Sequence, residues 1–126
     1  MNVPENLMYT DKHEWIRKDG VEAVIGITDY AQGELGDIVF IEIETAGEKL
    51  SKGDTFGTIE AVKTVSDLFM PVSGIVGEIN PVLADKPELV NKDPYGEGWM
   101  IRIKMLNPQE INSLLTPEKY LALISV

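Results

Sequence analysis

The chain has 126 residues, of which 44% are hydrophobic and 25% are charged, and its formal net charge is −10. This length and composition predict one globular domain, residues 1–126, that can bury a core without metal or disulfide staples. The chain has no cysteine and a single histidine, His13, which excludes disulfides, thiolate nucleophiles and zinc sites built from cysteine or several histidines.

The N-terminal stretch MNVPENLMYTDKHEW has neither the basic nor the apolar region of a secretory signal. No apolar run in the sequence approaches the roughly 20 residues of a membrane helix. The 11 basic residues are scattered along an acidic chain, whereas phosphate binding needs them clustered. We therefore expect a cytoplasmic protein that binds neither membranes nor nucleic acid.

Strand patterns then recur between turns rich in glycine. VEAVIGI (21–27) alternates, and Thr28 after it predicts the cap of a short helix that stops at Gly33. IVFIEIE (38–44) alternates again. In GWMIRIKM (98–105), one face collects the apolar residues and the other Arg102 and Lys104; the apolar residues are Trp99, Ile101, Ile103 and Met105. Many short strands joined by such turns predict a sandwich or barrel.

The last 20 residues carry helix-start signals. Asn107, Pro108 and Glu110 have the spacing of a capping box. Thr116 followed by Pro117 repeats the cap-then-proline signal. We expect a mainly β body, with a core at about 20–105, that is closed by a C-terminal helical segment at about 107–125.

The stretch IEAVKTVSDLFMPVSG (59–74) has two interpretations. Its apolar residues fall at helical spacing, which favours an amphipathic helix with Lys63 as a solvated charge; they are Ala61, Val62, Val65, Leu68 and Phe69. The β-branched residues favour instead two strands, 55–62 and 65–72, with Lys63 at the tip of their connection. Because no Asn-Gly or Asp-Gly pair marks a primed turn there, periodicity alone favours the helix.

Three blocks of the chain resemble the H proteins of the glycine cleavage system. They are HEWIRKDGVEAVIGITDYAQGELGDIVFIEI, GTIEAVKTVSDLFMPVSGIVGEIN and LVNKDPYGEGWMIRIK, which lie in the family's order over nearly the whole chain. The resemblance implies a lipoyl-domain-like barrel-sandwich hybrid with Lys63 at a hairpin tip, which reverses the helix preference. It also implies that lipoic acid is attached to Lys63 by an amide. Biotin carriers share the fold but place their lysine between methionines, and here its neighbours are Val62 and Thr64.

The function that the resemblance implies is that of a carrier without catalytic activity of its own. It would take an aminomethyl group from glycine decarboxylase, a pyridoxal-phosphate enzyme, to aminomethyltransferase, and then deliver electrons to dihydrolipoamide dehydrogenase. Lipoylating enzymes would be further partners, and a monomer suits a shuttle. Two alternatives stay open: a lipoyl-relay protein that donates lipoyl groups to 2-oxoacid dehydrogenases, and a helical interaction module with an ordinary Lys63.

The resemblance also suggests further site residues. Glu14 and Asp67 match family positions that contact the loaded arm in a cleft, where carboxylates suit a protonated amine. Lys12 stands where a serine is common in the family, and its charge would disfavour a bound ammonium. Glu60 is expected to help lipoylating enzymes recognise the attachment hairpin. We expect His13 to line the cleft or support it, because no nucleophile or metal partner suggests a catalytic base, and we expect no metal site.

Overall fold

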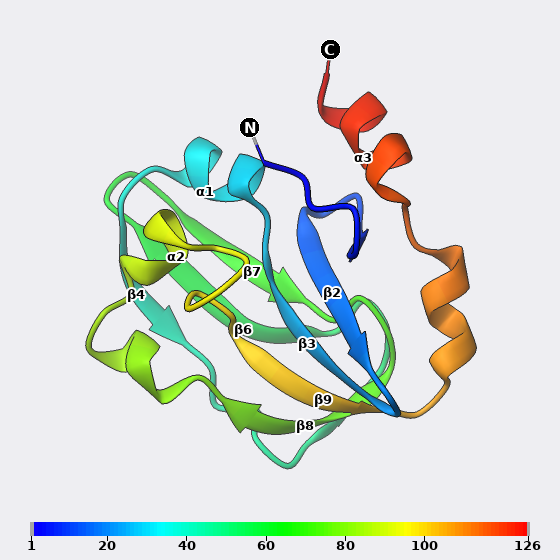
Figure 1. Ribbon diagram of the computed structural model, residues 1–126. Helices are drawn as coiled ribbons and strands as arrows, with labels where there is room; N and C mark the ends of the chain where they lie inside the picture. Colours follow the sequence, from blue (N-terminus) through cyan, green and yellow to red (C-terminus); the bar gives the residue numbers. More distant parts are fainter. Residues whose placement is uncertain (1, 126) are drawn as a thin grey trace.

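The computed structural model of the protein describes residues 2–125, and most of its regular structure is strand (Figure 1). The strands are β1 (Met8–Tyr9), β2 (Glu14–Asp19), β3 (Glu22–Ile27), β4 (Ile38–Glu42), β5 (Lys49–Leu50), β6 (Thr55–Ala61), β7 (Val65–Phe69), β8 (Gly74–Ile79) and β9 (Ile101–Met105). The helices are α1 (Asp29–Leu35), α2 (Leu89–Lys92) and α3 (Pro117–Ile124), with 3₁₀ helices η1 (Pro81–Ala84) and η2 (Pro108–Ser113).

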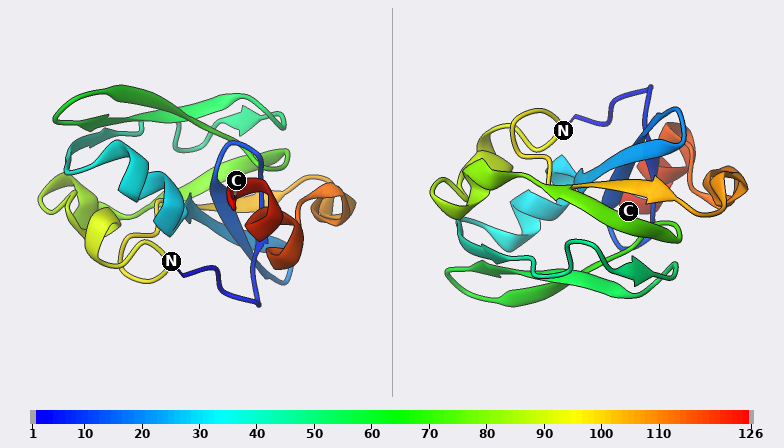
Figure 2. Two further views of the ribbon diagram at one scale, coloured as in Figure 1. Left: turned by 90° about the horizontal axis from the view of Figure 1, so that it is seen from above. Right: turned by 90° about the horizontal axis from the view of Figure 1, so that it is seen from below.

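The strands form two antiparallel sheets that face each other. The larger sheet has the order β1-β2-β3-β9-β8-β5, and the smaller one has the order β4-β6-β7. Figure 2 shows the two sheets as separate layers, with α1 between them at one end. The predicted mainly β, barrel-sandwich architecture, with one short helix in the N-terminal half and another at the C-terminus, is confirmed.

The core lies between the two sheets, and the alternation of the strands builds it. Ile25 and Ile103 from the larger sheet meet Ile59 and Leu68 from the smaller one. A second apolar cluster on the outer side of β2 packs the N-terminal segment against α3, and its buried members are Leu7, Tyr9, Trp15, Val24 and Tyr120. β9 begins at Ile101 rather than at Trp99, which packs at the margin of the second cluster instead of joining the predicted strand face.

The predicted helix caps are only partly correct. Thr28 accepts a hydrogen bond from the backbone N–H of Ala31, and Thr116 accepts one from Lys119 in the same way. However, α1 runs past Gly33 to Leu35, because Gly36 adopts a φ of 80° and closes the helix with its N–H on the Gln32 carbonyl.

The capping box at Asn107 is wrong. The Asn107 side chain makes no cap hydrogen bond, and η2 that follows is a 3₁₀ helix. Glu110 accepts hydrogen bonds from the backbone N–H (2.7 Å) and the hydroxyl (3.2 Å) of Ser73, and so ties η2 to the turn before β8. Glu110 therefore bonds to Ser73, which is distant in the sequence, and not to Asn107 as the capping box predicted.

The helix that periodicity favoured at 59–70 is also wrong, and the hairpin implied by the family resemblance is confirmed. β6 and β7 pair antiparallel, with Glu60 opposite Val65. A helix would have buried Val62 and Val65 on one face, but they are 70% and 62% exposed. Ile59 and Leu68 face the core instead, as alternate residues of two pleated strands do.

Candidate functional site

Lys63 lies at the tip of the hairpin between β6 and β7, and its side chain is exposed. The tip is closed by a hydrogen bond from the Ala61 N–H to the Thr64 carbonyl (2.8 Å). A second one, from Val62 to the Asp37 carbonyl (3.1 Å), ties the tip to the loop before β4. Within residues 2–125, Lys63 takes part in no ion pair. The hairpin therefore presents an unpaired lysine amine from a backbone that is held in place.

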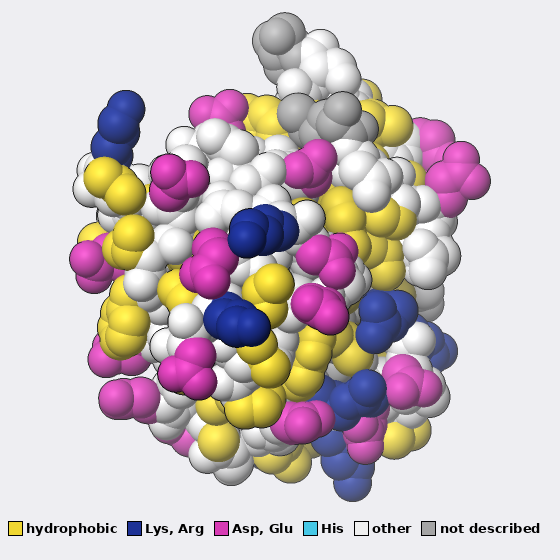
Figure 3. All heavy atoms as spheres, turned by 60° about the vertical axis from the view of Figure 1, so that its left-hand side comes forward, with side chains coloured by type: hydrophobic (Ala, Val, Ile, Leu, Met, Phe, Trp, Pro, Cys, Tyr) yellow, Lys and Arg dark blue, Asp and Glu magenta, His cyan; other side chains and the backbone are white. Residues whose placement is uncertain are grey.

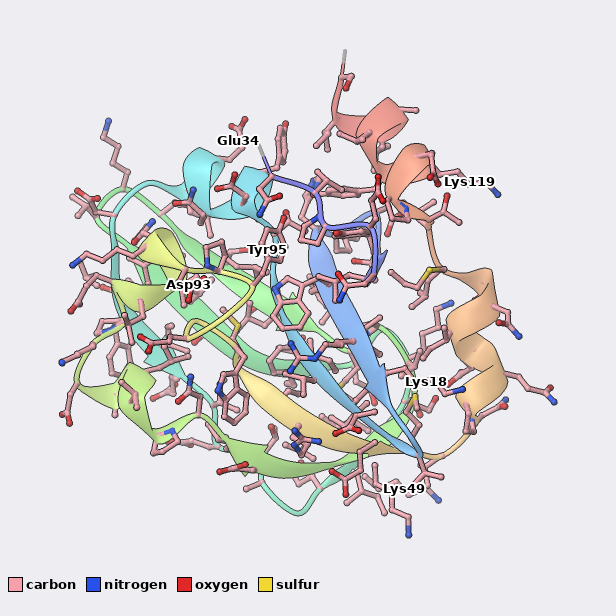
Figure 4. All side chains as sticks on the ribbon, viewed as in Figure 1. Lys18, Glu34, Lys49, Asp93, Tyr95 and Lys119 are labelled. Carbon is pink, nitrogen blue, oxygen red and sulfur yellow. The ribbon has the colours of Figure 1, made fainter. Side chains whose placement is uncertain are left out.

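Three neighbouring hollows connect this tip to the start of β2. The first, of about 400 Å³, is lined by Lys63 and by residues of the C-terminal part of α1 and the loop after it. It shares Glu34 and Leu35 with a second hollow of about 240 Å³ between α1 and the hairpin, which we call the cleft. Glu34 projects outward from α1 (Figure 4). The cleft shares Lys12 and Glu14 with a third hollow of about 630 Å³.

The cleft brings together residues that are far apart in the sequence. Glu14 from β2 and Asp67 from β7 both line it, as do Lys12 and His13 from the turn before β2. The rest of its wall is largely apolar, with contributions from Ile27, Ala31, Leu35, Ile59 and Leu68. Glu60 is exposed and does not line the cleft; it lies one strand position from the hairpin tip. Lys63, Glu14 and Asp67 thus belong to one connected surface, whereas Glu60 is separate from it.

Glu14 is the only fully buried charged side chain in the described part of the protein, with 2% exposure. Its Oε1 accepts a hydrogen bond from the Thr10 hydroxyl (2.6 Å), and its Oε2 lies 3.5 Å from the backbone nitrogen of Phe69. Burial raises the pKa of Glu14 to about 7, although both hydrogen bonds act in the opposite direction. A carboxyl group that lines the cleft can therefore exchange its proton near neutral pH.

His13 supports the cleft from the turn that precedes β2. Its backbone has a φ of 70°, a conformation that few residues other than glycine adopt. Its Nδ1 lies 2.8 Å from the Tyr120 hydroxyl, which lies 2.7 Å from the Thr28 hydroxyl. Burial lowers the pKa of His13, so its neutral form is favoured. The ring therefore ties β2 to α3 and to the start of α1 while it lines the cleft.

Sequence reasoning did not single out Thr10, Glu34 or Leu35. Glu34 and Leu35 reach the cleft because α1 lies beside the hairpin, and no local pattern encodes that contact. Thr10 precedes Glu14 by four residues, a spacing too common to serve as a signal. The burial of Glu14 was also not foreseen, since a glutamate that begins a strand is usually exposed.

Two structural features bear on other classes of function. In residues 2–125, no group of three or more His, Asp or Glu side chains is placed to hold a metal ion. None of the helices in that range has the length and apolar character needed to span a bilayer.

A model of the family described as glycine cleavage H-protein matches residues 7–125. The chain belongs to the glycine cleavage H-protein family. It is 58% identical to the glycine cleavage system H protein of Bacteroides fragilis, with 99% of each chain covered. It is 53% identical to that of Carboxydothermus hydrogenoformans, with 94% of this chain and 91% of the relative covered.

A solved structure of the same family agrees with the fold. The crystal structure of a glycine cleavage system H protein from Mycobacterium marinum matches with a TM-score of 0.89 and 35% identity, over 98% of this chain and 100% of that one. The H-protein family comprises the lipoyl-bearing shuttles of the glycine cleavage system, and this chain is therefore a component of that system. The lipoyl-relay alternative is not favoured by these relatives.

Proposed function

We propose that Nζ of Lys63 carries lipoic acid in an amide bond, and that the protein moves an aminomethyl group and then electrons between enzymes without catalysing a reaction itself. The observation that supports this most is the exposed lysine at the tip of a hairpin beside a cleft that is lined by a buried carboxyl group. When attached, the lipoyl group supplies the disulfide that accepts the aminomethyl group, which a chain without cysteine cannot supply.

The hairpin fits the attachment of a swinging arm. Two hydrogen bonds to neighbouring backbone hold its tip, so the long lysine stem moves while its base stays fixed. Formation of the amide removes the ammonium charge of Lys63. Glu60 is exposed next to the tip, where a lipoylating enzyme can reach it.

The cleft fits the loaded arm in both shape and charge. Its apolar wall suits the hydrocarbon chain of the arm, and the carboxyl groups of Glu14 and Asp67 suit the protonated amine at its end. Asp67 lies four residues from Lys63 along the hairpin, at most about 13 Å of strand, which the combined lysyl and acyl chains can span. Lys12 lines the same cleft, and its charge opposes the binding of the amine.

The partners follow from the same role. Glycine decarboxylase would load the arm, aminomethyltransferase would unload it, dihydrolipoamide dehydrogenase would reoxidise it, and lipoylating enzymes would attach it. Carboxylate side chains are spread across the face turned forward in Figure 3, and the net charge of −10 suits partners with basic surfaces. We further propose that the protein works as a monomer, since the arm must be free at each visit to an enzyme. We also propose that it works in the cytoplasm.

Reconstitution of glycine oxidation tests this proposal. The lipoylated chain is mixed with the three purified partner enzymes, glycine, tetrahydrofolate and NAD, and NADH is followed by absorbance. NADH should form only when the chain is present. Lys63→Arg should abolish its formation, whereas Lys104→Arg, at an exposed position on β9, should not. Absence of NADH with lipoylated wild-type chain, or normal NADH with Lys63→Arg, would overturn the proposal.

A further inference from the structure

Thr10 lies beside Glu14 in the turn between β1 and β2, and its hydroxyl makes three hydrogen bonds. It accepts from the backbone N–H groups of Lys12 (3.2 Å) and Glu14 (3.1 Å), and it donates to Oε1 of Glu14 (2.6 Å). A hydroxyl has two lone pairs and one hydrogen. Because the two N–H groups occupy the lone pairs, the hydrogen is left for the Glu14 carboxyl group, and Thr10 can act toward it only as a donor.

The Thr10 hydroxyl makes the shorter of the two hydrogen bonds to the buried Glu14 carboxyl group. The other donor within residues 2–125, the Phe69 N–H, lies 3.5 Å from Oε2, at the limit of hydrogen bonding. A short bond from a fixed donor favours the charged carboxylate over the neutral acid. It also holds Oε1 against the turn and leaves Oε2 facing the backbone of Phe69 on β7, a strand that also lines the cleft through Asp67 and Leu68.

We propose that Thr10 is a positioning residue that keeps the Glu14 carboxylate charged and turned toward the cleft when a cationic amine must be held there. The proposal rests on the proposed role of Glu14 in the cleft. The contact itself, however, is a property of the chain without its arm, and it can be measured there.

Other charged and titratable groups also surround Glu14, but none replaces the Thr10 hydroxyl. They are Tyr9 on β1, Asp11, Lys12 and His13 in the turn, Tyr30 and Glu34 on α1, Lys52 before β6, Asp67 on β7 and Tyr120 on α3. Asp11 raises the pKa of Glu14 and Lys12 lowers it, both by less than the Thr10 hydrogen bond does. Substitution of Thr10 leaves all of these groups in place, so a change in the Glu14 titration reports the loss of the hydroxyl and its three hydrogen bonds.

The test is a titration of the Glu14 side-chain carboxyl carbon by ¹³C NMR in the unmodified full-length chain. Thr10→Val replaces the hydroxyl with a methyl group of similar size, and Thr10→Ser keeps the hydroxyl. We expect the Glu14 midpoint to rise by about one pH unit in Thr10→Val and to return close to the wild-type value in Thr10→Ser. Thr45→Val, which removes a hydrogen bond to the Phe56 carbonyl, should leave the midpoint unchanged.

An unchanged midpoint in Thr10→Val, or an equal rise in Thr10→Ser, would overturn the proposal. If Thr10→Val does not fold, the wild-type chain still decides: the Thr10 hydroxyl proton should be protected from exchange with water above the Glu14 midpoint, because it is donated to the carboxylate. Rapid exchange at every pH would overturn the proposal equally. Neither measurement uses lipoate or a partner enzyme, so failure of the proposed carrier function would be seen separately, in the reconstitution.

Discussion

The Glu14 carboxyl group bridges the two sheets of the protein: its Oε2 lies 3.5 Å from the backbone nitrogen of Phe69. Glu14 belongs to β2 of the larger sheet, and Phe69 ends β7 of the smaller one. The two sheets therefore come close to each other at Glu14, which lines the cleft. Asp67, two residues earlier on β7, lines the same cleft, so one strand positions both a backbone contact to Glu14 and a second carboxylate.

Replacement of both carboxylates by amides should weaken retention of the loaded group. Glu14→Gln with Asp67→Asn removes two of the carboxylates that line the cleft and leaves Glu34, so we expect loss of the aminomethyl group to be roughly tenfold faster. Ammonia release from the loaded chain measures this loss, and intact mass should show that lipoylation still occurs. Glu78→Gln, at an exposed position on β8 outside the cleft, is the matched control and should retain the group normally. Equal decay of the double variant and the wild type would remove the proposed contact.

Lys12 offers a test in the opposite direction. Its ammonium group lines the cleft and opposes a second cation, so Lys12→Ser should slow loss of the loaded group several-fold at low salt. The difference should shrink at high salt, because ions screen an exposed charge. The same ammonia assay, run at two ionic strengths, measures both effects. Faster loss in Lys12→Ser would show that the lysine instead helps to hold the arm.

The pKa of Glu14 also makes the stability of the fold depend on pH. Burial raises this pKa from 4.5 to about 7, so between these values the folded chain binds more protons than the unfolded chain. The free energy of unfolding contributed by this group is therefore greatest below pH 4.5 and is lost as the pH rises to about 7. Glu14→Gln cannot titrate, and it should lack this trend.

Urea unfolding of both proteins at pH 5 and pH 8 measures the trend. The difference in unfolding free energy, wild type minus Glu14→Gln, should fall by up to roughly 3 kcal/mol between the two pH values. Burial lowers the pKa of His13, which gives a trend of the opposite sign, but His13 is present in both proteins and cancels in the difference. A difference that does not change with pH would contradict the burial of an ionisable carboxyl group at this position.

The hairpin and the helix that periodicity favoured predict different losses in the free energy of unfolding for two substitutions in β7. Val65 is exposed on β7, so Val65→Thr should change the free energy of unfolding by less than about 0.5 kcal/mol. Leu68 is buried in the core, and Leu68→Ala should cost about 2–5 kcal/mol. An amphipathic helix would bury both side chains on one face. Comparable losses for the two variants, measured by urea unfolding, would therefore favour the helix.

Sequence patterns were sufficient to predict a helix or strand where one face of the element is buried and capping or turn residues mark its ends. The alternation in IRIKM predicted β9, and Thr116 with Pro117 predicted the start of α3. The pattern failed at 59–70 because each of two adjacent strands contributed apolar residues, and together these fell at helical spacing. The resemblance to H proteins corrected that error, which the period alone could not do.

The candidate site was less accessible from the sequence. Lys63, Glu14 and Asp67 were named from the family motifs, and their common surface exists only because α1 and β2 lie beside the hairpin. The contacts of Thr10 with Glu14 and of Glu110 with Ser73 depend on how a turn or a terminal segment folds back. The residue types and spacings in these contacts are common in proteins, so no sequence pattern predicts the contacts.

Intact-mass spectrometry after treatment with lipoate, ATP to activate its carboxyl group, and a lipoylating enzyme tests most directly whether Lys63 is the attachment site. The wild-type chain and Lys104→Arg should each gain the mass of one lipoyl group, which peptide mapping should locate on Lys63. Lys63→Arg should gain none. A lipoyl group on Lys63→Arg, or no gain on the folded wild-type chain, would contradict a lipoyl arm on this hairpin.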